Sequence, residues 1–299
     1  MNNTYIKQVK LLLDVLPEVA KETCFAMHGG TAINLFVRDM PRLSVDIDLT
    51  FVKIAERGET LEGINLALTR IKERIEGLRP SIRVQHKEKV CKLQLDEFGL
   101  MIKIEVNMVG RGLIAEATKE PLCESAQEEF DVFCTMRLVP LGQLYGGKIC
   151  AAIDRQHPRD LFDVKLLLDR EGFTDEIKRG FLFGLVSSNR PTHEMLNPHL
   201  LDQRMAFENQ FEGMSEIEFS YDEYEVTRDQ LIKTIKSSLN ESDKAFLLSY
   251  NGLQPDWSIY DFQAFPSVKW KLFNLQKFKT ENSEIYQQQL NDLAKVLAQ

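Results

Sequence analysis

The segment from Val45 to Phe51 constrains the fold most, because its residues alternate strictly between apolar and polar types. The apolar set is Val45, Ile47, Leu49 and Phe51, and the polar set is Asp46, Asp48 and Thr50. This period of two is typical of a β-strand that buries one face. The side chains of Asp46 and Asp48 therefore leave the same face of a strand, about 7 Å apart along the chain.

A second alternating segment, residues 100–107, places Glu105 on its polar face. If the two strands are neighbours, Glu105 joins Asp46 and Asp48, and three carboxylates that close repel each other strongly. A divalent cation removes this conflict, and hard oxygen ligands without histidine or cysteine favour Mg²⁺ or Mn²⁺ over zinc. The alternative is a solvated strand face whose acidic residues serve solubility.

A glycine pair, Gly29 and Gly30, precedes these aspartates at close range and is followed by Thr31. Backbone N–H groups at a glycine-rich turn that opens onto a helix favour anion binding. A phosphate site beside a metal site indicates a nucleoside triphosphate. Arg42 and Ser44, just ahead of the aspartates, either order the strand or contact the nucleotide.

The rest of the chain predicts an α/β protein with a helical second half. Helices are expected over residues 4–22, 31–39, 59–78, 138–155 and 158–172, and strands over 24–30, 45–51, 81–85, 89–96 and 100–107. After Gly172 the pattern becomes helical and loop-rich, apart from one possible short strand at 217–219. We therefore expect a first domain over residues 1–172 and a mainly helical domain over residues 173–299.

Composition excludes several classes of protein. The 299 residues are 43% hydrophobic and carry a net charge of −8, which argues against a generally basic nucleic-acid binder but not against a local basic groove. The five cysteines are scattered and odd in number, as expected for reduced thiols. No stretch resembles a signal peptide or a membrane span, so we expect a cytoplasmic protein that does not contact the membrane.

Two charged positions in the predicted helices each have two interpretations. Lys148 lies on an apolar helix face, so its ammonium either reaches solvent or acts as a point charge on a triphosphate. Asp160 and Asp163 share one face of the next helix. Asp163 either serves the reaction or forms an ion pair that ties the two helices together.

Residues 268–279 form a predicted helix that mixes four lysines with Trp270, Phe273 and Phe278. Basic residues interleaved with aromatic ones are typical of surfaces that hold an RNA backbone and stack its bases. The alternative is an amphipathic helix that docks on the core.

The motif G-G-T-A-x-x-L followed by R-x-S-x-D-x-D-L, from Gly29 to Leu49, resembles that of a known family. It is similar to the nucleotidyltransferases of the AbiEii/AbiGii (MenT-like) toxin family, within the DNA polymerase beta superfamily. The resemblance continues over residues 103–107, an acidic strand, and over residues 141–168, which contain a lysine-bearing helix followed by an R-D-x-x-D helix. Residues 187–204 and 265–278 resemble the C-terminal helical region of one branch of the family. Thr31 stands where many members of the superfamily have serine, and it keeps the hydroxyl.

This resemblance implies a polymerase-beta-type nucleotidyltransferase core with a mixed sheet, followed by a helical C-terminal domain. The catalytic residues it implies are Asp46, Asp48, Lys148 and Asp163. The metal ligands it implies are Asp46, Asp48 and Glu105, for Mg²⁺ or Mn²⁺. The nucleotide-binding residues it implies are Gly29, Gly30, Thr31, Arg42, Ser44 and Lys148.

The reaction implied is transfer of an NMP from an NTP with release of pyrophosphate. The family suggests the 3′ end of a tRNA as the acceptor, growth arrest as the outcome, and control by a cognate antitoxin protein. Two other hypotheses stay open: transfer of AMP to a small molecule or a protein, and a non-catalytic nucleotide-binding protein that acts through interactions. The residues identify neither the nucleobase nor the acceptor.

Overall fold

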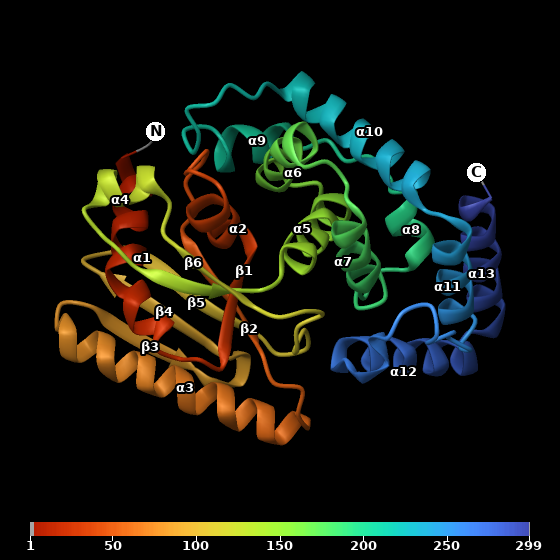
Figure 1. Ribbon diagram of the computed structural model, residues 1–299, viewed down its shortest axis with the longest axis horizontal. Helices are drawn as coiled ribbons and strands as arrows, with labels where there is room; N and C mark the ends of the chain where they lie inside the picture. The colour runs from red at the N-terminus through yellow and green to blue at the C-terminus, as the bar shows by residue number, and fades with distance from the viewer. Residues whose placement is uncertain (1–2, 299) are drawn as a thin grey trace. The chain divides into compact units, whose positions relative to one another are not determined.

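The computed structural model describes residues 3–298 (Figure 1). The chain divides into two compact units, which we describe separately. The first unit comprises Met1–Pro140 and Glu212–Glu218, and the second comprises Leu141–Phe211 and Phe219–Gln299. This division places the helices that follow Pro140 in the second unit, and the domain boundary near residue 172 stays a prediction.

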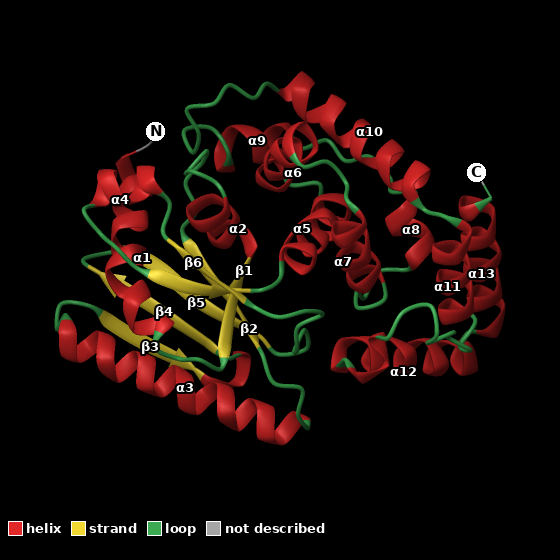
Figure 2. Cartoon of the chain, viewed as in Figure 1, coloured by secondary structure: helices red, strands yellow, loops and turns green. Residues whose placement is uncertain are grey.

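The first unit is built on a seven-stranded mixed sheet (Figure 2). The strands are β1 (Phe25–His28), β2 (Asp46–Phe51), β3 (Arg83–Lys87), β4 (Lys92–Glu97), β5 (Leu100–Asn107), β6 (Thr118–Pro121) and β7 (Thr135–Leu138). Their order is β3-β4-β5-β2-β1-β7-β6. β2 runs antiparallel to β1 and parallel to β5, so the two predicted acidic strands are indeed neighbours. β6 and β7 were not predicted from the sequence; β6 has no buried residue, so no apolar face marks it as a strand.

Helices cover this sheet because their apolar residues recur every three or four positions. The helical elements of the first unit are α1 (Asn3–Ala20), α2 (Gly29–Ala32), the π-helix η1 (Ile33–Val37), α3 (Arg57–Leu78), the 3₁₀ turn η2 (Glu88–Val90) and α4 (Glu124–Phe130). α1 and α3 lie alongside the strands in Figure 1. Leu12 and Leu16 of α1, and Leu68 and Ile71 of α3, have no accessible surface and belong to the core of this unit.

The segment from Glu212 to Glu218 belongs to the first unit through contacts with the chain just before β2. Leu43 donates its N–H to the Met214 carbonyl at 2.7 Å, and the Ser215 hydroxyl donates to the Pro41 carbonyl at 2.9 Å. Ser215 forms an isolated bridge with Arg42. The strand predicted at 217–219 is absent, since those residues form a bend and an extended loop.

The second unit is helical throughout the part that the structure describes. Its helices are α5 (Leu141–Arg155), α6 (Pro158–Arg170), α7 (Asp175–Leu185), α8 (Thr192–Leu196), α9 (Arg204–Gln210), α10 (Tyr221–Ser238), α11 (Glu241–Asn251), η3 (Phe262–Ala264), α12 (Pro266–Glu281) and α13 (Ser283–Leu297). α10 and α11 each begin with a capping box. Ser220 and Asn240, just before the two helices, accept from the backbone N–H groups of Glu223 and Asp243, whose side chains accept from the N–H groups of the capping residues in return. The predicted α/β fold with a mixed sheet and a helical remainder is confirmed.

Glycines allow α5 and α7 to approach at backbone contact. A Cβ on Gly146 would lie 2.1 Å from the Gly180 carbonyl carbon, and a Cβ on Gly180 would lie 1.7 Å from the Gly142 carbonyl oxygen. Neither position accepts any side chain without separating the helices. This crossing fixes α5, the helix that carries Lys148.

Candidate active site

The carboxylates of β2 and β5 lie side by side on one face of the sheet. The parallel register pairs Asp48 with Glu105 and Asp46 with Lys103, so these four side chains leave the same face. Ile47 and Leu49, which alternate with the aspartates, have no accessible surface on the opposite face. The alternation of apolar and polar residues, which predicted the acidic face, therefore also explains why the carboxylates lie on one face of the sheet.

Two lysines partly neutralise these carboxylates. Lys103 Nζ lies 3.5 Å from Asp46 Oδ2 and 3.9 Å from Glu105 Oε2. Lys92 of β4, which is opposite Glu105 in the antiparallel register, forms an ion pair with Glu105 as well. The pairing with Lys92 could not be predicted from the sequence, because the β4–β5 register is a tertiary property.

The donor set suits a hard cation that arrives with its substrate. No group of three or more histidine, cysteine, aspartate or glutamate side chains within residues 3–298 is arranged to hold a metal ion. Mg²⁺ commonly uses one or two protein carboxylates and completes its shell with water and substrate phosphates. Asp46 and Asp48 fit that requirement, whereas Glu105 would first have to give up its contacts with Lys92 and Lys103.

The glycine turn that opens α2 is packed directly against the aspartate strand. Gly29 has φ +79°, and a Cβ at this position would lie 2.5 Å from Asp48 Oδ2. A Cβ on Gly30 would lie 2.8 Å from Arg42 Nη2 and 2.9 Å from Ser44 Oγ. Both glycines therefore provide room for neighbouring polar side chains as well as backbone freedom.

Thr31 connects this turn to β2 through hydrogen bonds. Its side chain is fully buried, and its hydroxyl donates to the Asp46 carbonyl and lies 3.0 Å from Ser44 Oγ. Asn34 Nδ2 donates to the Gly30 carbonyl at 2.9 Å. In the structure the Thr31 hydroxyl thus bonds to the strand, and its contact with a phosphate stays a prediction.

Arg42 and Ser44 lie beneath the glycine turn. Arg42 is 2% exposed and donates from Nη1 to the Leu43 carbonyl at 2.9 Å, while Ser44 is also buried. Of the two predicted roles, ordering of the segment before β2 is therefore observed. Contact of either residue with nucleotide remains a proposal.

The second unit contains a buried ion cluster around Lys148 of α5. Its side chain is 7% exposed, and Nζ lies 3.0 Å from Asp160 Oδ1 and 3.0 Å from Asp163 Oδ2, both on α6. Arg155 Nε donates to Asp160 Oδ2 at 2.6 Å. The ion pair between helices that we considered for Asp163 is thus present, and it leaves a catalytic role open.

The charges of this cluster control the ionisation of Asp160. Burial by itself raises the pKa of a carboxyl group, but Lys148 and Arg155 outweigh it and hold the pKa of Asp160 well below its usual range. Asp160 is therefore ionised at any physiological pH. It holds the α5 and α6 helices together through two cations.

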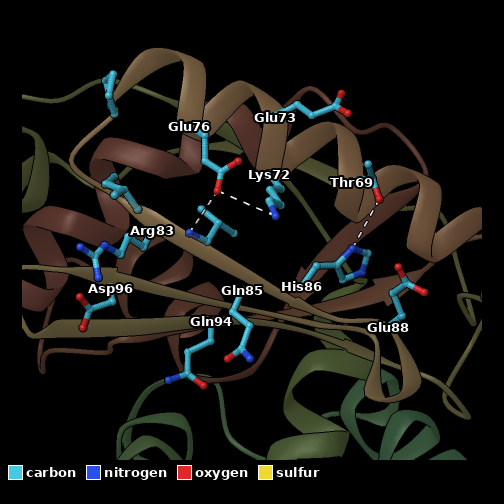
Figure 3. Close-up of a pocket in the computed structure, with 13 residues that line it drawn as sticks. Thr69, Lys72, Glu73, Glu76, Arg83, Gln85, His86, Glu88, Gln94 and Asp96 are labelled. Atoms are coloured by element: carbon cyan, nitrogen blue, oxygen red, sulfur yellow. Dashed lines mark hydrogen bonds and ion pairs between the residues drawn. The ribbon is translucent and has the colours of Figure 1, made fainter.

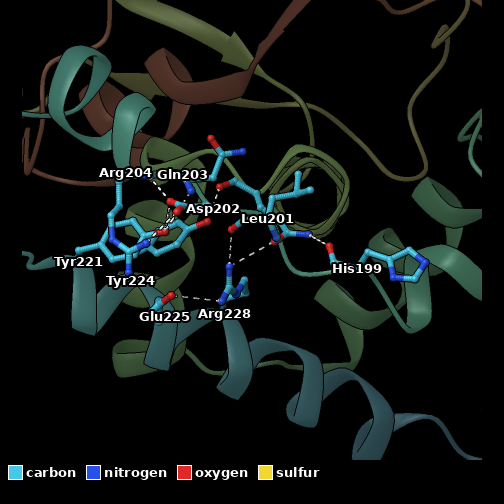
Figure 4. Close-up of polar contacts among 10 residues, drawn as sticks. His199, Leu201, Asp202, Gln203, Arg204, Tyr221, Tyr224, Glu225 and Arg228 are labelled. Atoms are coloured by element: carbon cyan, nitrogen blue, oxygen red, sulfur yellow. Dashed lines mark hydrogen bonds and ion pairs between the residues drawn. The ribbon is translucent and has the colours of Figure 1, made fainter.

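A hydrogen-bond network that the sequence analysis missed fixes the short connection between α5 and α6 (Figure 4). Gln156 has φ +48° and is 1% exposed; its amide donates to the His199 carbonyl at 2.7 Å and accepts from Leu201 N at 2.9 Å. The Tyr224 hydroxyl donates to the Gln156 carbonyl at 2.8 Å. Nothing in the residue types signals this role, since glutamine in a charged loop is ordinarily solvated.

A family model described as the nucleotidyl transferase AbiEii toxin of a type IV toxin–antitoxin system matches residues 10–274. The chain belongs to the AbiEii nucleotidyltransferase toxin family. A search of curated proteins finds no significant match. Among solved structures, the chain is similar to the nucleotidyltransferase toxin MenT4 of Mycobacterium tuberculosis, with a TM-score of 0.62 and 14% identity over 91% of this chain and 93% of that one.

The AbiEii family model spans both clusters of predicted site residues. The structure brings one set together in the first unit: Gly29, Gly30, Thr31, Arg42, Ser44, Asp46, Asp48 and Glu105. It brings Lys148 and Asp163 together in the second unit. As an AbiEii family member, the chain is a nucleotidyltransferase.

A separate cavity of about 980 Å³ in the first unit contains none of these residues (Figure 3). Side chains of α3, β3 and β4 line it, and several pair with each other. Glu76 Oε1 lies 3.9 Å from Lys72 Nζ and accepts from Val84 N at 3.4 Å. We assign it no part in the transfer reaction of this AbiEii protein.

No helix within residues 3–298 has the length and apolar character that crossing a membrane requires.

Proposed function

We propose that this AbiEii-family enzyme transfers an NMP from an NTP to the 3′ end of a tRNA, with Mg²⁺ or Mn²⁺ as cofactor. The observation that carries the proposal is the packing of the Gly29–Gly30 turn against Asp48 on a strand that also presents Asp46. This places backbone N–H groups next to a pair of hard oxygen donors. Few structural roles require both features at one position.

In this reaction a 3′ hydroxyl oxygen attacks the α-phosphorus of the NTP. A new phosphodiester bond forms, the α–β anhydride bond breaks, pyrophosphate leaves, and the hydroxyl proton passes to water. A divalent cation at the site would make the hydroxyl easier to deprotonate and offset charge on pyrophosphate. Asp46 and Asp48 would hold that cation, with Glu105 as the further ligand we expect.

The glycine turn and the buried polar side chains would position the triphosphate. Gly29, Gly30 and Thr31 would direct backbone N–H groups at phosphate oxygens, while Arg42 and Ser44 keep the turn in place. Because every donor in this cluster is fixed before the substrate binds, little reorganisation is needed during transfer.

We retain Lys148 and Asp163 as residues that activity requires. The Lys148 ammonium already has two carboxylate partners, so any contact with phosphate would replace one of them. Lysine provides a compact charge for such a site, and arginine differs in shape and hydration. Lys148→Arg should therefore not restore full activity.

The toxin role follows from the family. Transfer to tRNA would stop translation and arrest growth, and a cognate antitoxin protein would control the enzyme. The proposed substrates, an NTP and a tRNA, are cytoplasmic molecules.

Labelled transfer tests the proposal directly. The protein is incubated with each α-labelled NTP, Mg²⁺ and purified tRNA or total RNA, and the labelled product and pyrophosphate are measured. Asp48→Asn should lower transfer by at least about 100-fold, as loss of a group that acts on the transition state does. Asp96→Asn is the matched control, because Asp96 lies opposite Met101 at a distance from Asp48.

Three results would contradict the proposal. Transfer by Asp48→Asn at the wild-type rate would remove the carboxylate pair from the site. Label on a protein or a small molecule, with none on RNA under any NTP, would replace the tRNA acceptor with the AMP-transfer alternative. Absence of any labelled product would favour the non-catalytic alternative.

A further inference from the structure

α12 is anchored to the second unit by one face only. Val268 has no accessible surface, and Lys271 is 5% exposed. Lys271 Nζ donates to the Leu185 carbonyl at 2.7 Å and to the Arg190 carbonyl at 3.1 Å, near the end of α7. Lys271 is therefore a buried structural cation, and it cannot belong to a basic surface with the other lysines of this helix.

The opposite face of α12 presents two aromatic side chains to solvent. Trp270 is 49% exposed and Phe273 is 60% exposed, and their rings stack with centroids 5.7 Å apart and planes inclined by 21°. α12 therefore docks on the core through Val268 and Lys271, as one of the two alternatives expected, while Trp270 and Phe273 lie outside that contact. Exposed large aromatic side chains that lie together mark a binding surface more often than an isolated one does.

Lysines flank this aromatic pair along the helix. Lys269 and Lys277 are exposed and lie four residues before and four residues after Phe273, on the same side of α12. Lys277 has a surface partner, Glu281, at 3.8 Å. The row of Lys269, Trp270, Phe273 and Lys277 thus combines positive charge with aromatic rings in a chain of net charge −8.

We propose that this row, the α12 stripe, binds single-stranded RNA: a base stacks on Trp270 or Phe273 while Lys269 and Lys277 contact neighbouring phosphates. Every base offers a face for stacking, and flexible phosphates can follow the two lysines along the helix. The positive flanks favour a polyanion over a neutral or basic partner, and the flanking charges can follow the regular phosphates of a nucleic acid. The proposal deepens the proposed function, on which it rests for the choice of RNA.

Tryptophan fluorescence tests this stripe because the chain has only two tryptophans. Trp257 packs with ring centroids 6.2 Å from Phe246 and 6.3 Å from Tyr250, so it reports on the interior. Titration with a single-stranded oligoribonucleotide of about ten nucleotides, within the usual site size, should quench the emission of Trp270. Trp270→Phe should abolish that quenching, and Trp257→Phe should retain it.

Affinity measured by anisotropy of the labelled oligonucleotide separates stacking from charge. Trp270→Ala with Phe273→Ala should weaken binding roughly tenfold or more. Lys269→Gln with Lys277→Gln should reduce the slope of log affinity against log salt by about 1.4, for two phosphates on a single strand. Lys233→Gln with Lys295→Gln removes the same charge from exposed positions elsewhere on this unit and should change neither quantity. The buried face of α12 is intact in all of these variants, so folding is preserved.

The outcomes distinguish this inference from the proposed function. If the wild-type enzyme labels RNA while the α12 variants bind and react unchanged, the stripe is not an RNA surface and the proposed function stands. If no RNA is labelled but single-stranded RNA still quenches Trp270, the α12 stripe binds RNA and the proposal that tRNA is the acceptor is wrong. Quenching by the cognate antitoxin, with none by RNA, would overturn the RNA assignment.

Discussion

Gly29 shows how one residue can meet two separate demands. Its φ of +79° lies in the left-handed region, and its missing side chain leaves room for the Asp48 carboxylate 2.5 Å from where a Cβ would stand. Either demand alone favours glycine. Together they couple the shape of the turn to the position of Asp48, which we propose as a metal ligand.

We expect Gly29→Ala to abolish transfer and to lower the free energy of unfolding by about 1–2 kcal/mol, the usual cost of a left-handed non-glycine residue. Gly99→Ala is the matched control, because Gly99 has φ +84° with no atom near its missing Cβ. It should show a similar loss of stability with normal activity. Pyrophosphate release and urea denaturation measure the two effects, and an active Gly29→Ala enzyme would contradict the assigned role of the turn.

The ionisation of Asp160 makes the free energy of unfolding depend on pH in the acid range. Its pKa is held below that of an unfolded aspartate by Lys148 and Arg155 against the opposing effect of burial. A group with a lowered pKa in the folded state stabilises the protein fully above its unfolded pKa of about 3.9, and this stabilisation is lost as the pH falls below that value.

We therefore expect Asp160→Asn to lower the free energy of unfolding at neutral pH by about 3 kcal/mol, because Lys148 keeps only one carboxylate partner. The difference from wild type should shrink as the pH falls to about 3.5. Asp169→Asn on the same helix breaks the exposed pair with Lys165 and should cost less than about 1 kcal/mol. Urea midpoints at several pH values measure this, and a difference that grows in acid would refute the assignment.

At the scale of elements, the crossing of α5 and α7 fixes the helix that carries Lys148. Helices ordinarily approach to 8–10 Å with side chains between them, so direct backbone contact needs glycine on both sides. Gly142 and Gly146 of α5 meet Gly180 of α7 in this way. The absence of a side chain at these glycines is thus a requirement of packing, at a modest cost in helix propensity.

We expect Gly146→Ala to destabilise the protein by about 3 kcal/mol or more, because the new Cβ meets backbone that cannot move aside. Its neighbour Gly147 is exposed and has open space around the missing Cβ. Gly147→Ala should therefore stabilise by up to about 1 kcal/mol through helix propensity. Denaturant midpoints are measured for both variants. If Gly146→Ala and Gly147→Ala change the free energy of unfolding equally, helix propensity explains both effects and close packing at Gly146 is excluded.

For the molecule as a whole, charge is balanced locally although the chain is acidic. The net charge is −8, yet the carboxylates of β2 and β5 have Lys103 and Lys92 beside them. The fold therefore does not depend on a cation to relieve repulsion at this face. A cation is expected to bind when substrate phosphates supply further oxygen ligands.

We expect EDTA to abolish transfer without lowering the melting temperature. Mg²⁺ alone should raise that temperature little, and Mg²⁺ with a non-hydrolysable NTP analogue should raise it clearly, since only a ligand that binds the folded state tightly stabilises it. Thermal scans under the three conditions measure this. An equal increase with Mg²⁺ alone would mean that Glu105 completes a protein-only site, and Glu105→Gln should then remove the increase.

Elements with strong periodicity could be predicted from the amino-acid sequence. Strict alternation identified β2 and β5, and the spacing of apolar residues identified α1, α3, α5 and α6. It also placed Asp46, Asp48 and Glu105 on polar strand faces, because side-chain direction in a strand depends only on position. β6 gave no such signal, because none of its four residues is buried, and β7 was also missed.

Tertiary structure alone decided which side chains become partners. Strand order placed Glu105 beside Asp48, and the β4 register added Lys92, although nothing local to either residue specifies the other. The fold also separated the lysines of α12, burying Lys271 under backbone carbonyls and leaving Lys269 and Lys277 beside exposed aromatic rings. A residue's type and spacing fix the direction in which its side chain points, whereas its burial and its partners depend on segments distant in sequence that only folding brings near.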